Sequence, residues 1–316
     1  MTINLQSDKK IATRESYGKT LAELGQEHED IVVLDADLAD STKTGIFKKA
    51  FPERHFDCGI AEGNMMAMAA GLAASGKVVF ASSFAMFATG RAFEQIRNSI
   101  ANTSMNVKIA ASHAGITVGE DGSSHQCLED IALMRLLPNM TVVVPSDDTE
   151  AKAVIRAAYE FKGPMYIRLG RSAVPVFNDP DGYRFELGKG VVFKEGKDIT
   201  LIATGNEVYE TLKAAEMLAK DGIDAEVINI HTIKPIDKEL LINSLKKTGK
   251  GVTIEEHSVI GGLYSAVCEV TAAQYPVPVY AIGVEDCFGH SGPATELLHE
   301  FGLDAEGIYK KVKTYL

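Results

Sequence analysis

Short apolar runs alternate with longer segments of helical periodicity along the whole sequence, and this alternation limits the fold more than any other feature. IVVLDAD (31–37) is a continuous apolar run, as expected for a strand that is buried on both faces. Similar runs follow at 78–83, 106–112, 140–146 and 165–169, with a helix-length segment between each and the next. Strands that alternate with helices form parallel sheets with crossover helices. The sequence therefore predicts an α/β fold.

The alternation is interrupted once. Residues 176–197 are rich in Pro, Gly and Asp and carry no helical period, so we expect a linker there. The pattern restarts with DITLIATG (198–205) and continues to the C-terminal region, with Gly249 where a helix C-terminal cap belongs. We therefore expect two α/β domains, 1–175 and 198–316, each a mostly parallel sheet with helices on both faces.

Composition excludes several classes of protein. The formal net charge of −11 argues against a nucleic-acid binder, which needs a basic face. No run of 18 or more apolar residues could span a membrane, and MTINLQSDKK lacks the apolar core of a signal peptide. The four cysteines are far apart and form no C-x-x-C pair, which is typical of reduced thiols. We expect a cytoplasmic protein that binds neither nucleic acid nor membranes.

Glu62 is a lone carboxylate at the start of AEGNMMAMAAGLAAS (61–75), a segment of small and apolar residues that we expect to form a buried helix. The glutamate could simply be stabilised by the helix dipole. Alternatively, an apolar setting could raise its pKa, so that the acid stays protonated and donates a hydrogen bond. Composition does not separate these two interpretations.

Two further patterns carry possible chemistry. Phe84 and Phe87 are three residues apart, a spacing that suits a helical core stripe or a flat wall for a planar heteroaromatic ligand. His113, Asp121 and His125 lie in a Gly- and Ser-rich loop that follows an expected strand, where α/β sheets bind ligands. The two histidines do not have the spacing of a local metal pair, so we expect no metal site in this chain.

CGIAEGNM (58–65), SSFAMFATGRAFEQIRN (82–98) and GEDGSSHQ (119–126) together resemble the transketolase family. The resemblance extends from about residue 12 to 314 and implies a pyrimidine-binding domain followed by a transketolase C-terminal-like domain. In this family a Gly-x-x-Glu-x-x-Met segment carries the glutamate that touches thiamine diphosphate, which implies that role for Glu62. It also implies that Phe84 and Phe87 stack on the aminopyrimidine and that Asp37 lies near the thiazolium ring.

The same resemblance implies the sugar-phosphate contacts. His113 would hold the donor phosphate, Asp121 would read the C2 hydroxyl of the acceptor aldose, and His125 would hold the hydroxyls near the reacting carbon. Phosphate contacts are also implied for Arg14, Ser41 and Arg171, and the planar fork of arginine suits two phosphate oxygens. Glu62 and His125 would be the catalytic residues, in the transfer of a two-carbon ketol unit from a ketose phosphate to an aldose phosphate, as in the pentose phosphate pathway.

One part of the family's site has no counterpart in this sequence. The family binds Mg²⁺ through a Gly-Asp-Gly and a downstream Asn on a diphosphate-binding domain, and the only similar string here, EDG (120–122), belongs to the substrate loop. The resemblance therefore implies a partner, an N-terminal transketolase subunit that carries the diphosphate and Mg²⁺ half of the site. We expect a dimer of heterodimers.

Three alternatives remain open at this stage. The beta subunit of a 2-oxo acid dehydrogenase has the same two domains and the same glutamate, but not a GEDG-x-x-H loop. A deoxyxylulose-phosphate synthase normally keeps both halves on one chain. A non-catalytic assembly subunit would need neither Glu62 nor the histidine loop. A nucleotide site at TGNEVYET (204–211) is not supported, because the G-x-G-x-x-G spacing is missing.

Overall fold

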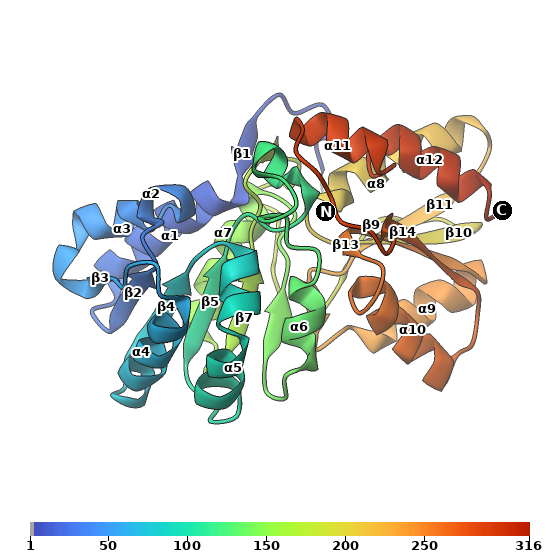
Figure 1. Cartoon of the computed structure of the whole chain (residues 1–316). Helices are drawn as coiled ribbons and strands as arrows, with labels where there is room; N and C mark the ends of the chain where they lie inside the picture. The colour runs from blue at the N-terminus through green and yellow to red at the C-terminus, as the bar shows by residue number, and fades with distance from the viewer. Residues whose placement is uncertain (1–2) are drawn as a thin grey trace.

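The computed structural model describes residues 3–316, which form two α/β domains side by side (Figure 1). The blue-to-green half of the chain supplies six strands of a seven-stranded sheet, and the yellow-to-red half supplies the seventh strand and a separate five-stranded sheet. A two-stranded ribbon of β1 (Lys10–Ala12) and β8 (Ala173–Pro175) joins the start of the chain to the segment between the domains. The α/β fold with two mostly parallel sheets is confirmed.

The first sheet has the strand order β12-β6-β7-β5-β4-β2-β3. Every neighbouring pair is parallel except β12 with β6. The strands are β2 (Ile31–Asp35), β3 (His55–Asp57), β4 (Val78–Ser82), β5 (Val107–Ala111), β6 (Thr141–Val143), β7 (Met165–Arg168) and β12 (Thr232–Lys234). The order reverses at β2, whose neighbours β3 and β4 lie on opposite sides of it. Open α/β sheets bind ligands at such a switch point.

Alternate residues of the first sheet face two different helix layers. Ile31 and Val33 pack with α1 (Thr13–Glu27), α3 (Gly45–Ala50) and α7 (Asp148–Glu160). Val32 and Leu34 pack with α4 (Glu62–Ala74) and α6 (Asp130–Leu136) on the other face. Shorter elements complete the layers: α2 (Ala39–Thr42), η1 (Pro52–Arg54), η2 (Met86–Arg91), α5 (Phe93–Gln95), η3 (Ile96–Ala101) and η4 (Ile116–Asp121). This arrangement explains the continuous apolar strand, because both of its faces are buried.

The second sheet has the order β14-β13-β10-β11-β9, and only the edge strand β9 is antiparallel. Its strands are β9 (Val191–Lys194), β10 (Ile199–Ala203), β11 (Ala225–Asn229), β13 (Gly251–Ser258) and β14 (Val279–Val284). Figure 1 shows helices α8, α11 and α12 above this sheet and α9 and α10 below it. These helices are α8 (Glu207–Lys220), α9 (Lys238–Thr248), α10 (Leu263–Gln274), α11 (Ala294–Glu300) and α12 (Ala305–Lys313).

Local capping residues fix several helix ends. Asp147, Asp237 and Asp304 each accept a hydrogen bond from a backbone N–H in the first turn of α7, α9 and α12. Gly249 closes α9 in the left-handed conformation, with φ of 75°, and its N–H donates to the Leu245 carbonyl. The predicted C-terminal cap at Gly249 is confirmed.

The two domains share one continuous core. The hydrophobic cluster that lies under α4 and α6 continues through Val144, Ile230 and Ile233 to the α9 and α10 face of the second sheet. β12 belongs by sequence to the second half of the chain, yet it pairs with β6 of the first sheet. Because apolar contacts and a strand cross the boundary, the domains are packed together rather than tethered.

The segment 176–197, expected to be a linker, is more ordered than its composition suggests. Phe177 and Tyr183 are buried, and Tyr183 donates a hydrogen bond to Glu150. Its last part contains β9, which adds an edge strand to the second sheet. Valine and phenylalanine at 191–193 supply the apolar edge, a signal that the Pro- and Gly-rich composition around them obscured. The boundaries of the two domains stay predictions.

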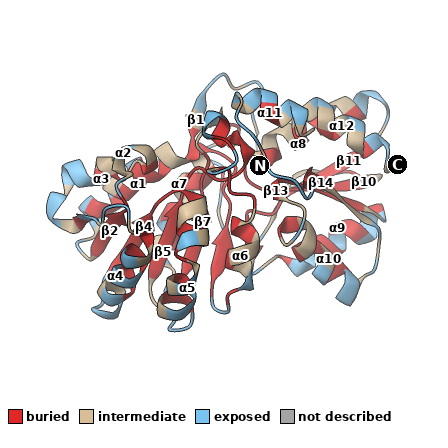
Figure 2. Cartoon of the chain, in the orientation of Figure 1, coloured by how far each residue is buried: buried red, intermediate tan, exposed pale blue. Residues whose placement is uncertain are grey.

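Helix α4 corrects one expectation. The segment 61–75 has no polar face, so we expected it to be buried throughout. In the structure Met65, Met66 and Ala69 are buried, but Ala67, Met68 and Gly71 lie on an exposed face (Figure 2). A layered α/β sheet covers only the inner side of a crossover helix, so the outer side of α4 is apolar and faces solvent.

Candidate active site

The first sheet brings the expected site residues to one edge. Asp37 follows β2, Glu62 follows β3, Phe84 follows β4, His113 follows β5 and Arg171 follows β7. Since these five strands are parallel, their carboxyl ends meet on the same side of the sheet. The edge also contains the switch point beside β2, so the topology places the candidate residues where ligands of this fold class bind.

Glu62 is the first residue of α4, and its side chain is 1% exposed. Nη1 of Arg91 donates to both carboxylate oxygens, at 3.0 Å to Oε1 and 2.8 Å to Oε2. The Arg91 side chain is 52% exposed, so the pair lies at the surface end of a buried acid. In this chain by itself, a guanidinium is therefore the partner of the Glu62 carboxylate.

Phe84 and Phe87 form an aromatic wall next to this pair. Their ring centroids are 6.0 Å apart and nearly parallel. Only Phe87 belongs to the helical element η2; Phe84 forms a strand-like bridge with Ser112. The two rings therefore do not share one helical face, as their spacing suggested, but they still lie side by side. The guanidinium of Arg91 covers the Phe87 ring, with Cζ 4.7 Å from the centroid.

His113 extends the wall on the other side of Phe84. Its ring stacks on Phe84 at 3.7 Å, and its backbone has a positive φ of 59°, a conformation that costs a non-glycine residue of the order of 1 kcal/mol or more. Nδ1 contacts the Ser112 hydroxyl at 2.9 Å, and Nε2 lies 3.4 Å from Nη1 of Arg14. An arginine can only donate, so Nε2 accepts and the ring is neutral.

Burial and nearby cationic groups agree with a neutral His113. Burial lowers its pKa to about 3, and Arg14, Arg171, His125 and Lys43 act in the same direction. Arg14 is itself held by a second contact, because its Nη1 donates to the Ser41 carbonyl at 2.8 Å. Partial burial and the proximity of Arg171 lower the pKa of Arg14. Two guanidinium groups near a neutral histidine make this a subsite that attracts an anion.

The substrate loop, residues 113–127, carries the remaining candidates. The His125 ring points its edge at Phe87, at 5.2 Å between centroids, and its Nδ1 contacts the Ser124 hydroxyl at 2.9 Å. Asp121 is the last residue of η4 and is exposed. Arg171 holds this loop from β7, because its Nη1 donates to the Val118 carbonyl and to Glu120, both at 2.7 Å.

The structure thus joins most of the expected residues but not all of them. A continuous network of side-chain and backbone contacts joins six of them: Arg14, Ser41, His113, Phe84, Phe87 and His125. Arg91 connects Glu62 to this network. Within residues 3–316, no hydrogen bond, ion pair or ring contact connects the side chain of Asp37 or Asp121 to this network. Asp37 borders a surface cleft of about 290 Å³ that Ser41 also lines.

Sequence reasoning missed two residues that organise the site. Asp57 accepts hydrogen bonds from the N–H groups of Asp37 and Gly59, both at 3.0 Å, and so fixes the loops after β2 and β3. Arg91 pairs with Glu62 and covers Phe87. The signal for Arg91 was available, since it lies four residues after Phe87 and one helical turn places such residues on the same face. No sequence pattern marked Asp57.

No group of three or more His, Cys, Asp or Glu side chains within residues 3–316 could hold a metal ion. No helix in the same range is long and apolar enough to cross a membrane.

Comparison with known proteins gives two family matches that together span most of the chain. Residues 9–176 match the transketolase pyrimidine-binding domain, and residues 188–308 match the transketolase C-terminal domain. A relative from Methanocaldococcus jannaschii, described as a transketolase C-terminal section, is 53% identical over 95% of this chain and 94% of its own length. A 6-deoxy-6-sulfo-D-fructose transketolase subunit from Clostridium sp. strain MSTE9 is 44% identical over 94% of this chain and 92% of its own length.

A solved structure agrees with these matches. A protein described as a split-gene transketolase in an inactive β4 tetramer superimposes with a TM-score of 0.89 and 56% identity, over 96% of this chain and 98% of that chain. The resemblance predicted from CGIAEGNM and GEDGSSHQ is therefore confirmed at the level of the family. The fold, both matched domains and the relatives lead to one conclusion: this chain belongs to the transketolase family.

Proposed function

We propose that this chain is the pyrimidine-side subunit of a two-chain transketolase, which transfers a two-carbon ketol unit from a ketose phosphate to an aldose phosphate. The observation that carries the proposal is the place of the Arg91 guanidinium. It is a flat group with N–H donors, it lies on the Phe87 ring, and it donates to both oxygens of Glu62. The site therefore accommodates a planar, hydrogen-bonding group at the position proposed for the cofactor ring.

Thiamine diphosphate is the cofactor of the transketolase family, and its aminopyrimidine fits this position. The ring is planar and needs a flat apolar wall, which Phe87 and Phe84 supply. Glu62, buried and at the first turn of α4, would hydrogen-bond a ring nitrogen and control the proton there. Bound thiamine diphosphate supplies the electron sink that carries the two-carbon unit between sugars.

We assign the sugar phosphate to the anion-binding subsite beside this wall. Arg14 and Arg171 would bind its oxygens, and the Ser41 backbone keeps Arg14 in place. His113 presents no proton on Nε2 in the present arrangement, because that nitrogen accepts from Arg14. A phosphate dianion would raise the pKa of His113 and favour its protonated form, so we expect proton uptake when the sugar phosphate binds.

We place His125 at the reacting end of this arrangement. Its ring edge meets Phe87, so a sugar bound between Phe87 and the substrate loop would place its hydroxyls within reach of His125. Asp121 is exposed at the end of η4 and would read a hydroxyl of the acceptor. Asp37 would lie near the thiazolium ring.

We also propose a partner subunit that binds the diphosphate and Mg²⁺. Neither matched family domain is the diphosphate-binding one. The solved relative is described as a split-gene protein whose β4 tetramer is inactive, which supports a need for a second chain. Ile60 is 76% exposed and lies two residues before Glu62, and Phe56 and Met68 are exposed on either side of it in sequence. We place this apolar surface at the contact between subunits in a cytoplasmic dimer of heterodimers.

The test is a reconstitution assay. The chain is purified alone and together with the product of the adjacent reading frame, and both samples are assayed for two-carbon transfer from xylulose 5-phosphate to ribose 5-phosphate with thiamine diphosphate and Mg²⁺. Transfer in the mixture alone is the expected result. Pyruvate-dependent turnover without ketol transfer would instead indicate a 2-oxo acid dehydrogenase subunit. Transfer by this chain alone would contradict the proposed partner.

A further inference from the structure

The substrate loop is closed at its base by contacts within the first domain. Ala114 and Cys127 form a parallel bridge, and the Gly115 N–H donates to the Cys127 carbonyl at 2.9 Å. These contacts hold the two ends of the loop next to β5. They do not hold η4, the short helix inside the loop that ends at Asp121.

The start of η4 is held from the second domain. The N–H of Thr117 donates to Oε1 of Glu256 at 2.5 Å, and Glu256 lies on β13, 139 residues later in the chain. The other carboxylate oxygen accepts from Nδ2 of Asn206 at 3.2 Å. The first N–H groups of a helix have no partner within the helix, so this carboxylate satisfies one of them.

The backbone around this contact is shaped to admit the carboxylate. Gly115 has a φ of 80°, and a Cβ at this position would lie 2.3 Å from Oε1 of Glu256. Both the left-handed conformation and the lack of space require glycine here. The carboxylate and the loop therefore fit together closely, and Glu256 does more than fill a gap between domains.

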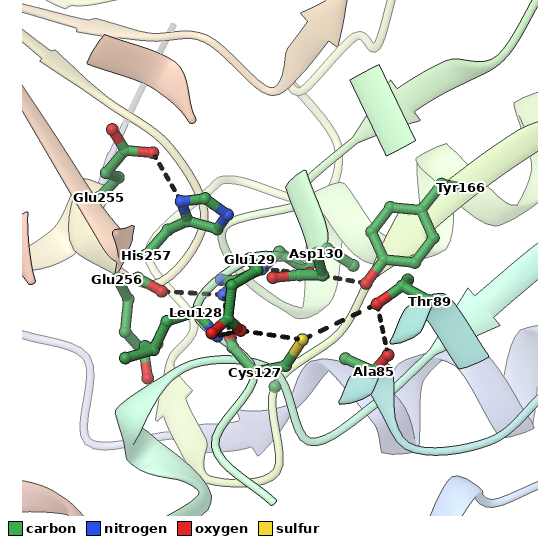
Figure 3. A network of polar contacts seen from close by, with 12 residues as sticks. Ala85, Thr89, Cys127, Leu128, Glu129, Asp130, Tyr166, Glu255, Glu256 and His257 are labelled. Carbon is green, nitrogen blue, oxygen red and sulfur yellow. Dashed lines mark hydrogen bonds and ion pairs between the residues drawn. The ribbon is translucent and has the colours of Figure 1, made fainter. Parts of the chain in front are cut away.

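The charge of Glu256 is balanced at the domain junction, part of which is drawn in Figure 3. Glu256 is 2% exposed, and burial raises its pKa while the positive charge of Arg168 lowers it. Nη2 of Arg168 donates to the Glu256 carbonyl at 2.8 Å, and its Nε donates to Asp130 at 2.8 Å. Asp130 is the first residue of α6, directly after the substrate loop. The junction thus connects β13 to both η4 and the helix that follows the loop.

We propose that Glu256 is a positioning residue, through which the second domain fixes the loop that carries Asp121 and His125. The effect on catalysis rests on the proposed function, in which this loop contacts the substrate. The contact itself is independent of that role. It gives the second domain a defined part in the site: it sets the geometry of the substrate loop without touching the substrate.

Glu255 provides a matched control. It is the preceding residue on β13 and is also buried, but its oxygens accept from the N–H groups of Leu263 and Tyr264, at 2.6 Å and 2.8 Å, at the start of α10 in its own domain. E255A and E256A each remove a buried carboxylate from the same strand and leave backbone donors without a partner. Only E256A removes a contact to the substrate loop.

The first measurement is amide hydrogen exchange on the chain alone, which needs neither cofactor nor activity. E256A should raise the exchange rates of amides 117–125 by tenfold or more, as expected for the loss of a charge-assisted hydrogen bond, with little change at the start of α10. E255A should give the reverse pattern. Equal effects of both variants on the loop, or no effect of E256A, would overturn the proposal. If E256A does not fold, Thr117→Pro removes the same donor from the loop side and should give the same local increase.

The second measurement is steady-state kinetics of the assembled enzyme. E256A should raise KM for the sugar phosphates about tenfold and lower kcat by a similar factor, since the loop that loses its position carries both the proposed substrate contacts and the proposed catalytic His125. E256Q should restore a KM close to that of the wild type, because its amide oxygen can still accept a hydrogen bond from the Thr117 N–H. A loss confined to kcat, or no recovery with glutamine, would contradict positioning. If the wild-type enzyme transfers no ketol unit, the proposed function fails. The hydrogen-exchange result would still show whether Glu256 holds the loop.

Discussion

Two buried glutamates in this chain have opposite surroundings. Glu62, at the edge of the first sheet, has one partner, the half-exposed Arg91. Glu256, at the domain junction, is enclosed by Thr117, Asn206 and the charge of Arg168. The partner of Glu62 is a long, half-exposed side chain. The groups around Glu256 belong to the interior of the same chain.

The difference shows how one chain can contain both a rigid frame and an incomplete site. Burying a carboxylate is unfavourable unless hydrogen bonds or a counter-charge compensate. At the junction the compensation comes from backbone N–H groups and a buried arginine, which fixes the substrate loop. At Glu62 the compensation comes from Arg91, whose side chain is 52% exposed. The following predictions test this contrast, from the largest expected effect to the smallest.

The largest effect is expected at the open site. Glu62→Gln should lower kcat of the assembled enzyme toward 10⁴-fold, the upper range for a group that controls a proton in the reaction. The urea unfolding midpoint of the chain should change little, because glutamine keeps the size of the side chain and one acceptor for Arg91. Near-normal turnover in this variant would remove Glu62 from the catalytic machinery.

The next effect should appear at the junction, in stability. Arg168→Met removes the cation between Asp130 and Glu256 and leaves both acids buried without it. We expect the free energy of unfolding to fall by about 3–5 kcal/mol, measured by urea denaturation. Arg156→Met is the surface control, since Arg156 pairs with Glu23 and Glu27 in solvent and should cost less than about 1 kcal/mol. Similar losses in both variants would mean that the junction is no more tightly compensated than the surface.

The junction should also make stability depend on pH. Burial raises the pKa of Glu255 to about 7, above the ordinary glutamate value of 4.5. The folded state then binds this proton more tightly than the unfolded state, so the stabilisation is complete below pH 4.5 and is lost as pH rises through 7. Over that window Glu255 contributes about 3 kcal/mol to the free energy of unfolding. Glu255→Gln should flatten the curve of unfolding free energy against pH, and exposed Glu239→Gln should not; parallel curves for Glu255→Gln and wild type would contradict the prediction.

The sequence predicted the frame of the molecule better than its details, and the reason is physical. Alternating apolar runs such as IVVLDAD and the cap at Gly249 depend on neighbours along the chain, so their signal is local. The place of Glu62, Phe84, Phe87, His113 and Arg171 on one edge follows from the rule that parallel strands end together. Their family roles came from resemblance, which the family matches support without testing each residue.

The missed features all depend on residues far apart in sequence. Thr117 and Glu256 are separated by 139 residues, and no local sequence pattern connects them. β12 joins the first sheet although its sequence lies among elements of the second. The sequence neighbours of Glu62 are Ala, Gly and Met, and they left two interpretations of this residue open. Its ion-pair partner, Arg91, comes from the next crossover segment.

The smallest effect, and the sharpest test of the open site, concerns Arg91. If its guanidinium occupies the position of the cofactor ring, the cofactor must displace it, and Arg91→Ala should tighten binding of thiamine diphosphate to the assembled enzyme up to about fivefold, the value of a half-exposed ion pair. Calorimetric titration of the cofactor measures this directly. Arg97→Ala is the control, because Arg97 is exposed and donates only to the neighbouring Asn98. Weaker binding in Arg91→Ala would instead make Arg91 part of the bound site, so that Glu62 keeps its guanidinium partner when the ring is present.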